Sequence, residues 1–156
     1  MKKFLILFFT VVLIFQVQEN RAQDYIRSLG FRAGLSQGIS YKQFYSTTDA
    51  VEGILSVRWR GFYITGLWQR HAPAFDVRSL YWFYGGGAHA GFWDGSANPW
   101  FNDNRAVIGI DGIVGLEYVL DDIPINVSID WKPAFNLIGY TGFWGDELGL
   151  TVRFMF

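Results

Sequence analysis

The chain has 156 residues, enough for a single domain, and carries 13 Lys and Arg against 14 Asp and Glu. This near-neutral balance excludes charge-driven binding to nucleic acid. The absence of Cys excludes a disulfide framework, a thiolate metal site and a lipid-bearing Cys. Aromatic residues make up 19% of the chain, and Gly occurs 18 times. Many strands joined by tight turns, with aromatic girdles, produce such a composition.

The first residues form a unit of their own. Lys2 and Lys3 precede an apolar run over residues 4–15, and polar residues follow up to residue 23. This is the layout of a secretory signal peptide, and the run is too short to cross a hydrocarbon core of ~30 Å as a helix. We expect residues 1–22 to be a cleaved signal peptide and residues 23–156 to be the exported domain. An uncleaved amphipathic or membrane helix is the alternative.

Beyond the signal, apolar and polar residues alternate with the period of a strand. The predicted strands are 29–36, 39–45, 51–59, 62–71, 80–93, 108–120, 125–136 and 148–156. A tilted strand needs about 9 to 11 residues to cross the hydrocarbon core, so eight of them nearly use up the exported domain. The predicted fold is therefore all-β, an eight-stranded antiparallel up-and-down transmembrane β-barrel. The even count depends on two strands, rather than one long strand, over residues 29–45.

Two regions interrupt the alternating pattern: the first predicted turn, and the region from Pro133 to residue 147. Gln37 and Gly38 are a turn signal between the first two strands. Pro133 cannot donate to a ladder, so we expect it to lie above the membrane surface, where pairing can lapse. Residues 137–147, rich in Gly and aromatic side chains, are predicted to be a connection.

The last segment, LGLTVRFMF, has one apolar face and ends on Phe156. An unpaired apolar edge invites aggregation, whereas closure of a barrel in a membrane pairs every backbone group. We therefore expect this segment to close the barrel.

The charges within the strands all fall opposite the apolar faces. They are Arg32, Lys42, Glu52, Arg58, Asp111, Glu117, Asp130, Lys132 and Arg153. A Lys or Arg that faces lipid near the midplane costs about 2 to 4 kcal/mol, so we expect these side chains to pair inside. An eight-stranded barrel is just wide enough for its side chains to fill, which predicts a plugged lumen. The alternative is the solvent face of a soluble antiparallel sandwich.

Two further features favour a membrane barrel. Small residues recur on the inward faces, at Gly30, Gly34, Gly109, Gly115 and Gly149. Trp residues near segment ends predict an interfacial aromatic belt. The belt residues are Trp59, Trp68, Trp82, Trp93 and Trp131.

Together these patterns resemble the small outer-membrane β-barrel proteins of Gram-negative bacteria, of the OmpA/OmpX-like kind. The segments GISYKQF, AVEGIL, WFYGGGAHAGFW, GIDGIVGLEYVL, INVSIDWKPAFNLIGYTGFWGDELGL and TVRFMF look like an uncharacterised family common in Bacteroidetes. The resemblance implies an outer-membrane location, contact with its lipid, and recognition of the last strand by the barrel-assembly machinery. By resemblance, the residues recognised are Leu150, Val152, Phe154 and Phe156.

Motifs for chemistry are weak. The two His residues, His71 and His89, have no G-x-S-x-G partner, and we interpret them as a rim and a lumen residue. The acids of the connections, among them Asp146 and Glu147, lack calcium-loop spacing, and Gly85–Gly87 is no phosphate cradle. We predict neither a metal nor a cofactor. The connection 94–105, with its segment 98–101, is the best candidate for binding an external ligand, but a cap over the barrel is favoured.

We therefore predict a non-enzymatic outer-membrane barrel with a structural or surface-interaction role. A lipid A acylase or deacylase and a narrow porin-like pore are the alternatives.

Overall fold

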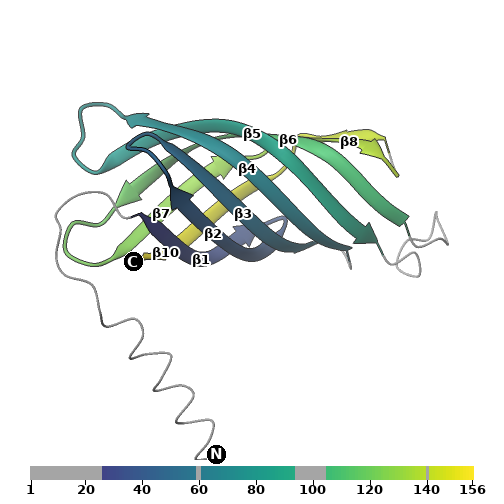
Figure 1. The fold of residues 1–156 in the computed structure, drawn as a ribbon, viewed down its shortest axis with the longest axis horizontal. Helices are drawn as coiled ribbons and strands as arrows, with labels where there is room; N and C mark the ends of the chain where they lie inside the picture. Colours follow the sequence, from purple (N-terminus) through teal and green to yellow (C-terminus); the bar gives the residue numbers. More distant parts are fainter. Residues whose placement is uncertain (1–25, 59–60, 94–104, 140) are drawn as a thin grey trace, which may run out of the picture.

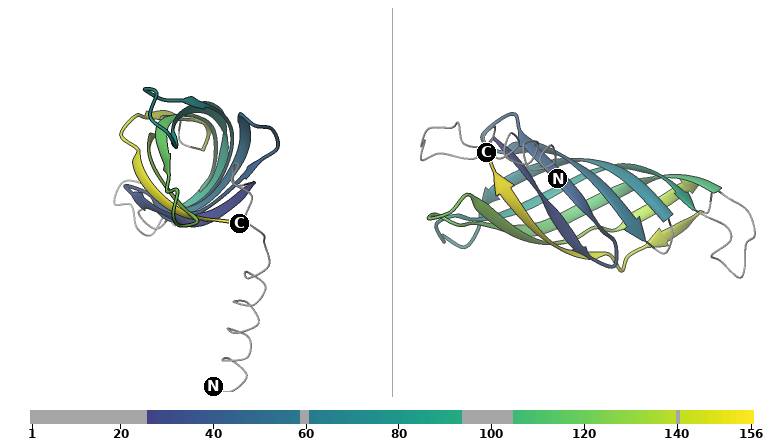
Figure 2. Two further views of the ribbon diagram at one scale, coloured as in Figure 1. Left: turned by 90° about the vertical axis from the view of Figure 1, so that its left-hand side faces the viewer. Right: turned by 90° about the horizontal axis from the view of Figure 1, so that it is seen from below.

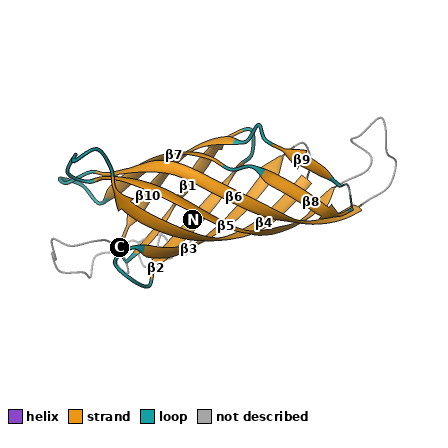
Figure 3. Cartoon of the chain, turned by 90° about the horizontal axis from the view of Figure 1, so that it is seen from above, coloured by secondary structure: helices purple, strands orange, loops and turns teal. Residues whose placement is uncertain are grey.

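The computed structural model describes residues 26–58, 61–93, 105–139 and 141–156. These residues form ten strands and no helix (Figure 3). The strands are β1 (Arg27–Gly34), β2 (Gln37–Phe44), β3 (Asp49–Arg58), β4 (Gly61–Pro73), β5 (Leu80–Trp93), β6 (Arg105–Val119), β7 (Ile125–Trp131), β8 (Ala134–Ile138), β9 (Gly142–Trp144) and β10 (Leu148–Met155). Among these residues no helix is long and apolar enough to cross a membrane.

The ten strands follow eight paths around a closed barrel. Each strand from β1 to β6 pairs antiparallel with the next one along the chain. Both β7 and β8 pair with β6, and β10 returns to pair with β7 and with β1. Seen end-on, the strands form a ring, and seen from the side they tilt across it (Figures 1 and 2). The predicted eight-stranded up-and-down barrel is thus confirmed, and so is closure by the last strand.

The chain turns at 45–48, 74–79 and 120–124 at one end of the barrel, where Phe156 also lies (Figure 1). We call this the C-terminal end. The opposite end holds the turn at 35–36. The two strands predicted within residues 29–45 are both present. Their turn lies at Leu35 and Ser36, so the predicted turn at Gln37 and Gly38 is wrong: both residues belong to β2.

The expected lapse of pairing at Pro133 is present, but it is limited to residues 132 and 133. The position of Pro133 relative to a membrane surface stays a prediction. β7 and β8 lie in line, because Trp131 pairs with Val114 and Ala134 pairs with Asp111. Pro133 contributes its carbonyl, which accepts a bond from the Gly112 amide at 2.8 Å. A proline costs the ladder only its missing N–H, so the strand resumes after a break of two residues.

Residues 137–147 are likewise more ordered than a plain connection. β8 runs on to Ile138 and forms a hairpin with β9, in which Ala134 pairs with Trp144. Further along, Trp131 pairs with Leu148. Three residues, 145–147, therefore lie opposite two residues, 132 and 133, which is a β-bulge. The bulge changes which residues of this path face inward.

Candidate functional site

The side chains sort by charge across the barrel wall. Among the strand residues whose side chains the structure describes, only Arg27, Asp49 and Arg70 are charged on the outer face, and all three lie at the C-terminal end. The remaining outer positions carry apolar side chains, Gly, Gln or Tyr. Alternation with period two produces this division, since each strand turns successive side chains to opposite sides.

All nine charged residues predicted to face inward are buried. They are Arg32, Lys42, Glu52, Arg58, Asp111, Glu117, Asp130, Lys132 and Arg153, and none is more than 7% exposed. Each one has an ion-pair partner of opposite charge inside the barrel. Because a buried, unpaired charge costs several kcal/mol, the pairing is what makes their burial possible.

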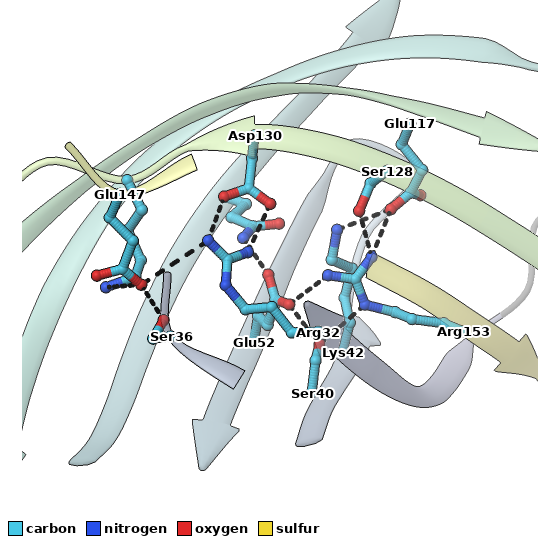
Figure 4. A network of polar contacts seen from close by, with 12 residues as sticks. Arg32, Ser36, Ser40, Lys42, Glu52, Glu117, Ser128, Asp130, Glu147 and Arg153 are labelled. Carbon is cyan, nitrogen blue, oxygen red and sulfur yellow. Dashed lines mark hydrogen bonds and ion pairs between the residues drawn. The ribbon is translucent and has the colours of Figure 1, made fainter. Parts of the chain in front are cut away.

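One group of ion pairs centres on Arg153, whose guanidinium contacts two carboxylates (Figure 4). It donates to Glu52 and lies 3.5 Å from Glu117. It also donates to the hydroxyls of Ser40 at 2.9 Å and Ser128 at 2.7 Å. Lys42 donates to Glu117 at 2.8 Å. These contacts join five of the eight paths of the barrel, β2, β3, β6, β7 and β10, across its interior.

A second group lies further from the C-terminal end. Arg32 donates from both terminal nitrogens to Asp130, at 2.6 and 2.7 Å, in the bidentate geometry that a planar guanidinium favours. Lys132 lies 3.1 Å from Asp111, whose other oxygen is 2.7 Å from Nδ1 of His89. The second ring nitrogen of His89 is 2.8 Å from Asn136. Both nitrogens of His89 are therefore engaged within the wall.

Glu147 belongs to this group, although its sequence position predicts a connection residue. Its carboxylate accepts a bond from Ser36 at 2.5 Å and lies 3.3 Å from Lys132 and 3.8 Å from Arg58 (Figure 4). Adding it to the four predicted acids gives five buried carboxylates against five buried cations. The sequence contains an indication of this position, because residue 147 shares the odd-numbered face of Gly149, Thr151 and Arg153.

Part of the interior is apolar. Ile54, Leu67, Phe83 and Ile113 form one cluster, contributed by β3, β4, β5 and β6. His71 lies beside it, with its ring stacked on Phe83 at 5.2 Å and its Nε2 3.4 Å from Lys42. The interpretation of His71 as a rim residue is thus wrong, because the side chain is buried in the interior.

The inward glycines make room for this filling. A Cβ added to Gly149 would overlap the guanidinium of Arg32, and one added to Gly109 would overlap the His89 ring. The smallest residue is therefore required where a large side chain crosses the barrel.

Three of the predicted belt residues lie on the outer face, namely Trp68, Trp82 and Trp131. Trp93 does not. It shares the inward face of β5 with His89, contacts Tyr63 edge to face at 6.3 Å, and lies tilted against Trp144 at 6.0 Å. Trp59 and the segment 98–101 lie outside the described residues. The outer face of the last strand carries Leu150, Val152, Phe154 and Phe156, all partly exposed.

Comparisons with protein-family models, with curated proteins and with solved structures find no match for this chain. The fold and the division of charge across the wall are therefore the basis for any functional conclusion.

Proposed function

We propose that this chain is an integral outer-membrane β-barrel with a closed, ion-paired interior, and that its role is structural or surface-interacting rather than enzymatic. The observation that carries the proposal is the division of the wall over the described residues: ten ionised side chains lie inside, and the described outer face carries charge at one end only. In water, an uncharged outer face would not stabilise the protein, because the outer face of a soluble barrel can be polar.

The exposed apolar side chains of the outer wall also support the proposal. Large apolar side chains such as Phe31, Ile64 and Ile129 are about half exposed or more on the outer face. Contiguous apolar surface of this extent marks an interaction site, and here it surrounds the barrel. A hydrocarbon environment removes the cost of that exposure, while any outward Lys or Arg at mid-depth would cost about 2 to 4 kcal/mol.

The proposal also includes how the chain is exported, which lipid it contacts and how it is assembled. A signal peptide over residues 1–22 would export it, and the outer-membrane lipid would cover its wall. The barrel-assembly machinery would recognise the closing strand, of which Phe154 and Phe156 are the terminal aromatic residues. The resemblance to OmpA/OmpX-like barrels supports this part of the proposal.

Two alternatives find less support. A lipid-modifying enzyme needs a nucleophile beside a base, whereas His89 is held by Asp111 and Asn136. A pore needs an open path, whereas a cavity beside Tyr63 and Lys132 measures about 20 Å³, room for about one water.

Cell fractionation tests the proposal directly. We expect the protein in the outer-membrane fraction, resistant to alkaline carbonate, and faster-migrating on a gel when it is not boiled. Recovery of a soluble periplasmic protein would refute it. Discrete conductance steps in planar bilayers would refute the closed interior alone.

A further inference from the structure

A groove of about 520 Å³ crosses the outer face of the barrel. Its floor is formed by outward side chains of neighbouring strands, among them Trp82 of β5, Leu116 of β6, and Ile129 and Trp131 of β7. Pro73, at the end of β4, bounds it toward the C-terminal end. The lining is predominantly apolar, and the one ionisable residue in it, Asp130, pairs its carboxylate with Arg32 in the interior.

The rim of the groove carries an unusual residue. Phe75 lines it and is 81% exposed. Phe75 and Asp76 both have φ of 52°, and Ser79 has φ of 66°. Side chains other than Gly rarely adopt this left-handed conformation, and a bulky residue such as Phe is the least expected there. The connection 74–79 thus holds an aromatic ring out from the wall at one end of the groove.

We propose that this groove holds one acyl chain of a glycerophospholipid from the leaflet at the C-terminal end. The inference rests on the proposed function, because it requires the wall to lie in a bilayer. The groove is continuous with the apolar wall that the bilayer would cover. The volume of about 520 Å³ lies within the range of roughly 300 to 1,000 Å³ that ligand pockets in proteins have, so the groove has room for part of one extended acyl chain.

Charge at the rim fits the other end of such a lipid. The connection that holds Phe75 also carries an acid, Asp76, and an exposed cation, Arg78. A phosphate accepts bonds from a guanidinium, and an ammonium group is attracted to a carboxylate. The pair therefore complements a zwitterionic headgroup, with Trp82 at the level where aromatic residues meet the membrane surface.

The test uses the whole mature chain in vesicles of phosphatidylethanolamine and phosphatidylglycerol. A trace of phosphatidylethanolamine carries a photoactivatable diazirine in its acyl chain. After illumination, mass spectrometry locates the labelled peptides. Val114→Trp fills the groove between Tyr84 and Trp131, the neighbours of Val114 across the two ladders. Val51→Trp is the matched control, since Val51 lies on the outer face of β3 and does not line the groove.

We expect peptides covering residues 73–82 and 114–131 to carry about fivefold more label than the walls of β1 to β3, which corresponds to roughly 1 kcal/mol. Val114→Trp should remove this excess and Val51→Trp should keep it. Equal labelling of both walls in the unmodified protein would overturn the inference. The gel migration of each variant with and without boiling reports its insertion into the membrane separately. Failure of the membrane proposal can therefore be distinguished from failure of the groove proposal.

Discussion

Arg32 and Asp130 face each other across the interior and form two parallel hydrogen bonds of 2.6 and 2.7 Å. The residues lie 98 positions apart in the sequence and on strands that β10 separates. Their pairing therefore reports the closed state of the barrel, because neither partner is satisfied until β10 has joined β1 to β7. The first prediction follows from this dependence.

Asp130→Ala should leave the Arg32 guanidinium buried beside the distant Glu147 alone, at 3.9 Å. Breaking a buried pair on one side costs about 3 to 5 kcal/mol, whereas replacing both partners by apolar residues is often neutral. We expect the double variant Arg32→Met, Asp130→Leu to recover most of the loss. Urea unfolding in lipid vesicles, followed by Trp fluorescence, measures both. Equal losses in the single and double variants would contradict the pairing.

Glu147 and its neighbour Asp146 offer a matched comparison. Glu147→Gln removes the charge that faces Lys132 and Arg58 in the interior and should cost about 2 to 4 kcal/mol. Asp146→Asn removes a carboxylate whose side chain is 62% exposed and contacts Arg58 at 3.0 Å. An exposed ion pair contributes about 0 to 1 kcal/mol. The same unfolding assay should rank the two variants in this order, and the reverse order would show that Glu147 does not face the interior.

The position of Gly149 under Arg32 predicts a steric effect. Gly149→Ala should cost about 1 to 3 kcal/mol, because the added methyl group displaces the guanidinium from Asp130. Gly53→Ala is the control, since nothing lies within 4 Å of the added atom. Gly53→Ala should be neutral or stabilise by about 0.4 to 1 kcal/mol through the unfolded chain. Equal effects of the two substitutions would argue against close packing over Gly149.

A charged side chain on the outer wall should destabilise the barrel only where it lies deep in the hydrocarbon core. Ile110 lies near the middle of β6, whereas Ile123 lies in the turn 120–124 at the C-terminal end. Ile110→Arg should destabilise the inserted barrel by about 2 to 4 kcal/mol and Ile123→Arg by about 0 to 1 kcal/mol. The readout is the free energy of unfolding in vesicles. Similar small values for both would favour a water-facing wall.

The sequence predicted the faces of the strands well, and the physical reason is simple. Arg58, Asp130 and Arg153 turn inward because alternation depends on local geometry alone. Alternation does not predict the ion-pair partners. The stagger of strands around the closed barrel decides that Arg32 pairs with Asp130 and Arg153 with Glu52.

The errors lie where alternation is interrupted or extended. The bulge at 145–147 inserts one residue, so Trp144 and Glu147 both face inward although three positions separate them. Pro133 interrupts the predicted strand only over residues 132 and 133, because its carbonyl still accepts a bond from the Gly112 amide. Trp93 was assigned to the outer belt from its place at a strand end, while its odd-numbered position beside His89 indicated the interior.

The orientation of the wall can be measured residue by residue, because the chain contains no Cys and single-cysteine variants are clean to label. A nitroxide at Phe31→Cys, in the middle of β1, is compared with one at Asp122→Cys in a turn at the C-terminal end. In vesicles, the account predicts that the label at 31 collides with oxygen and not with a water-soluble nickel complex, and that the label at 122 shows the reverse. Free access of the nickel complex to position 31 would contradict a lipid-facing wall.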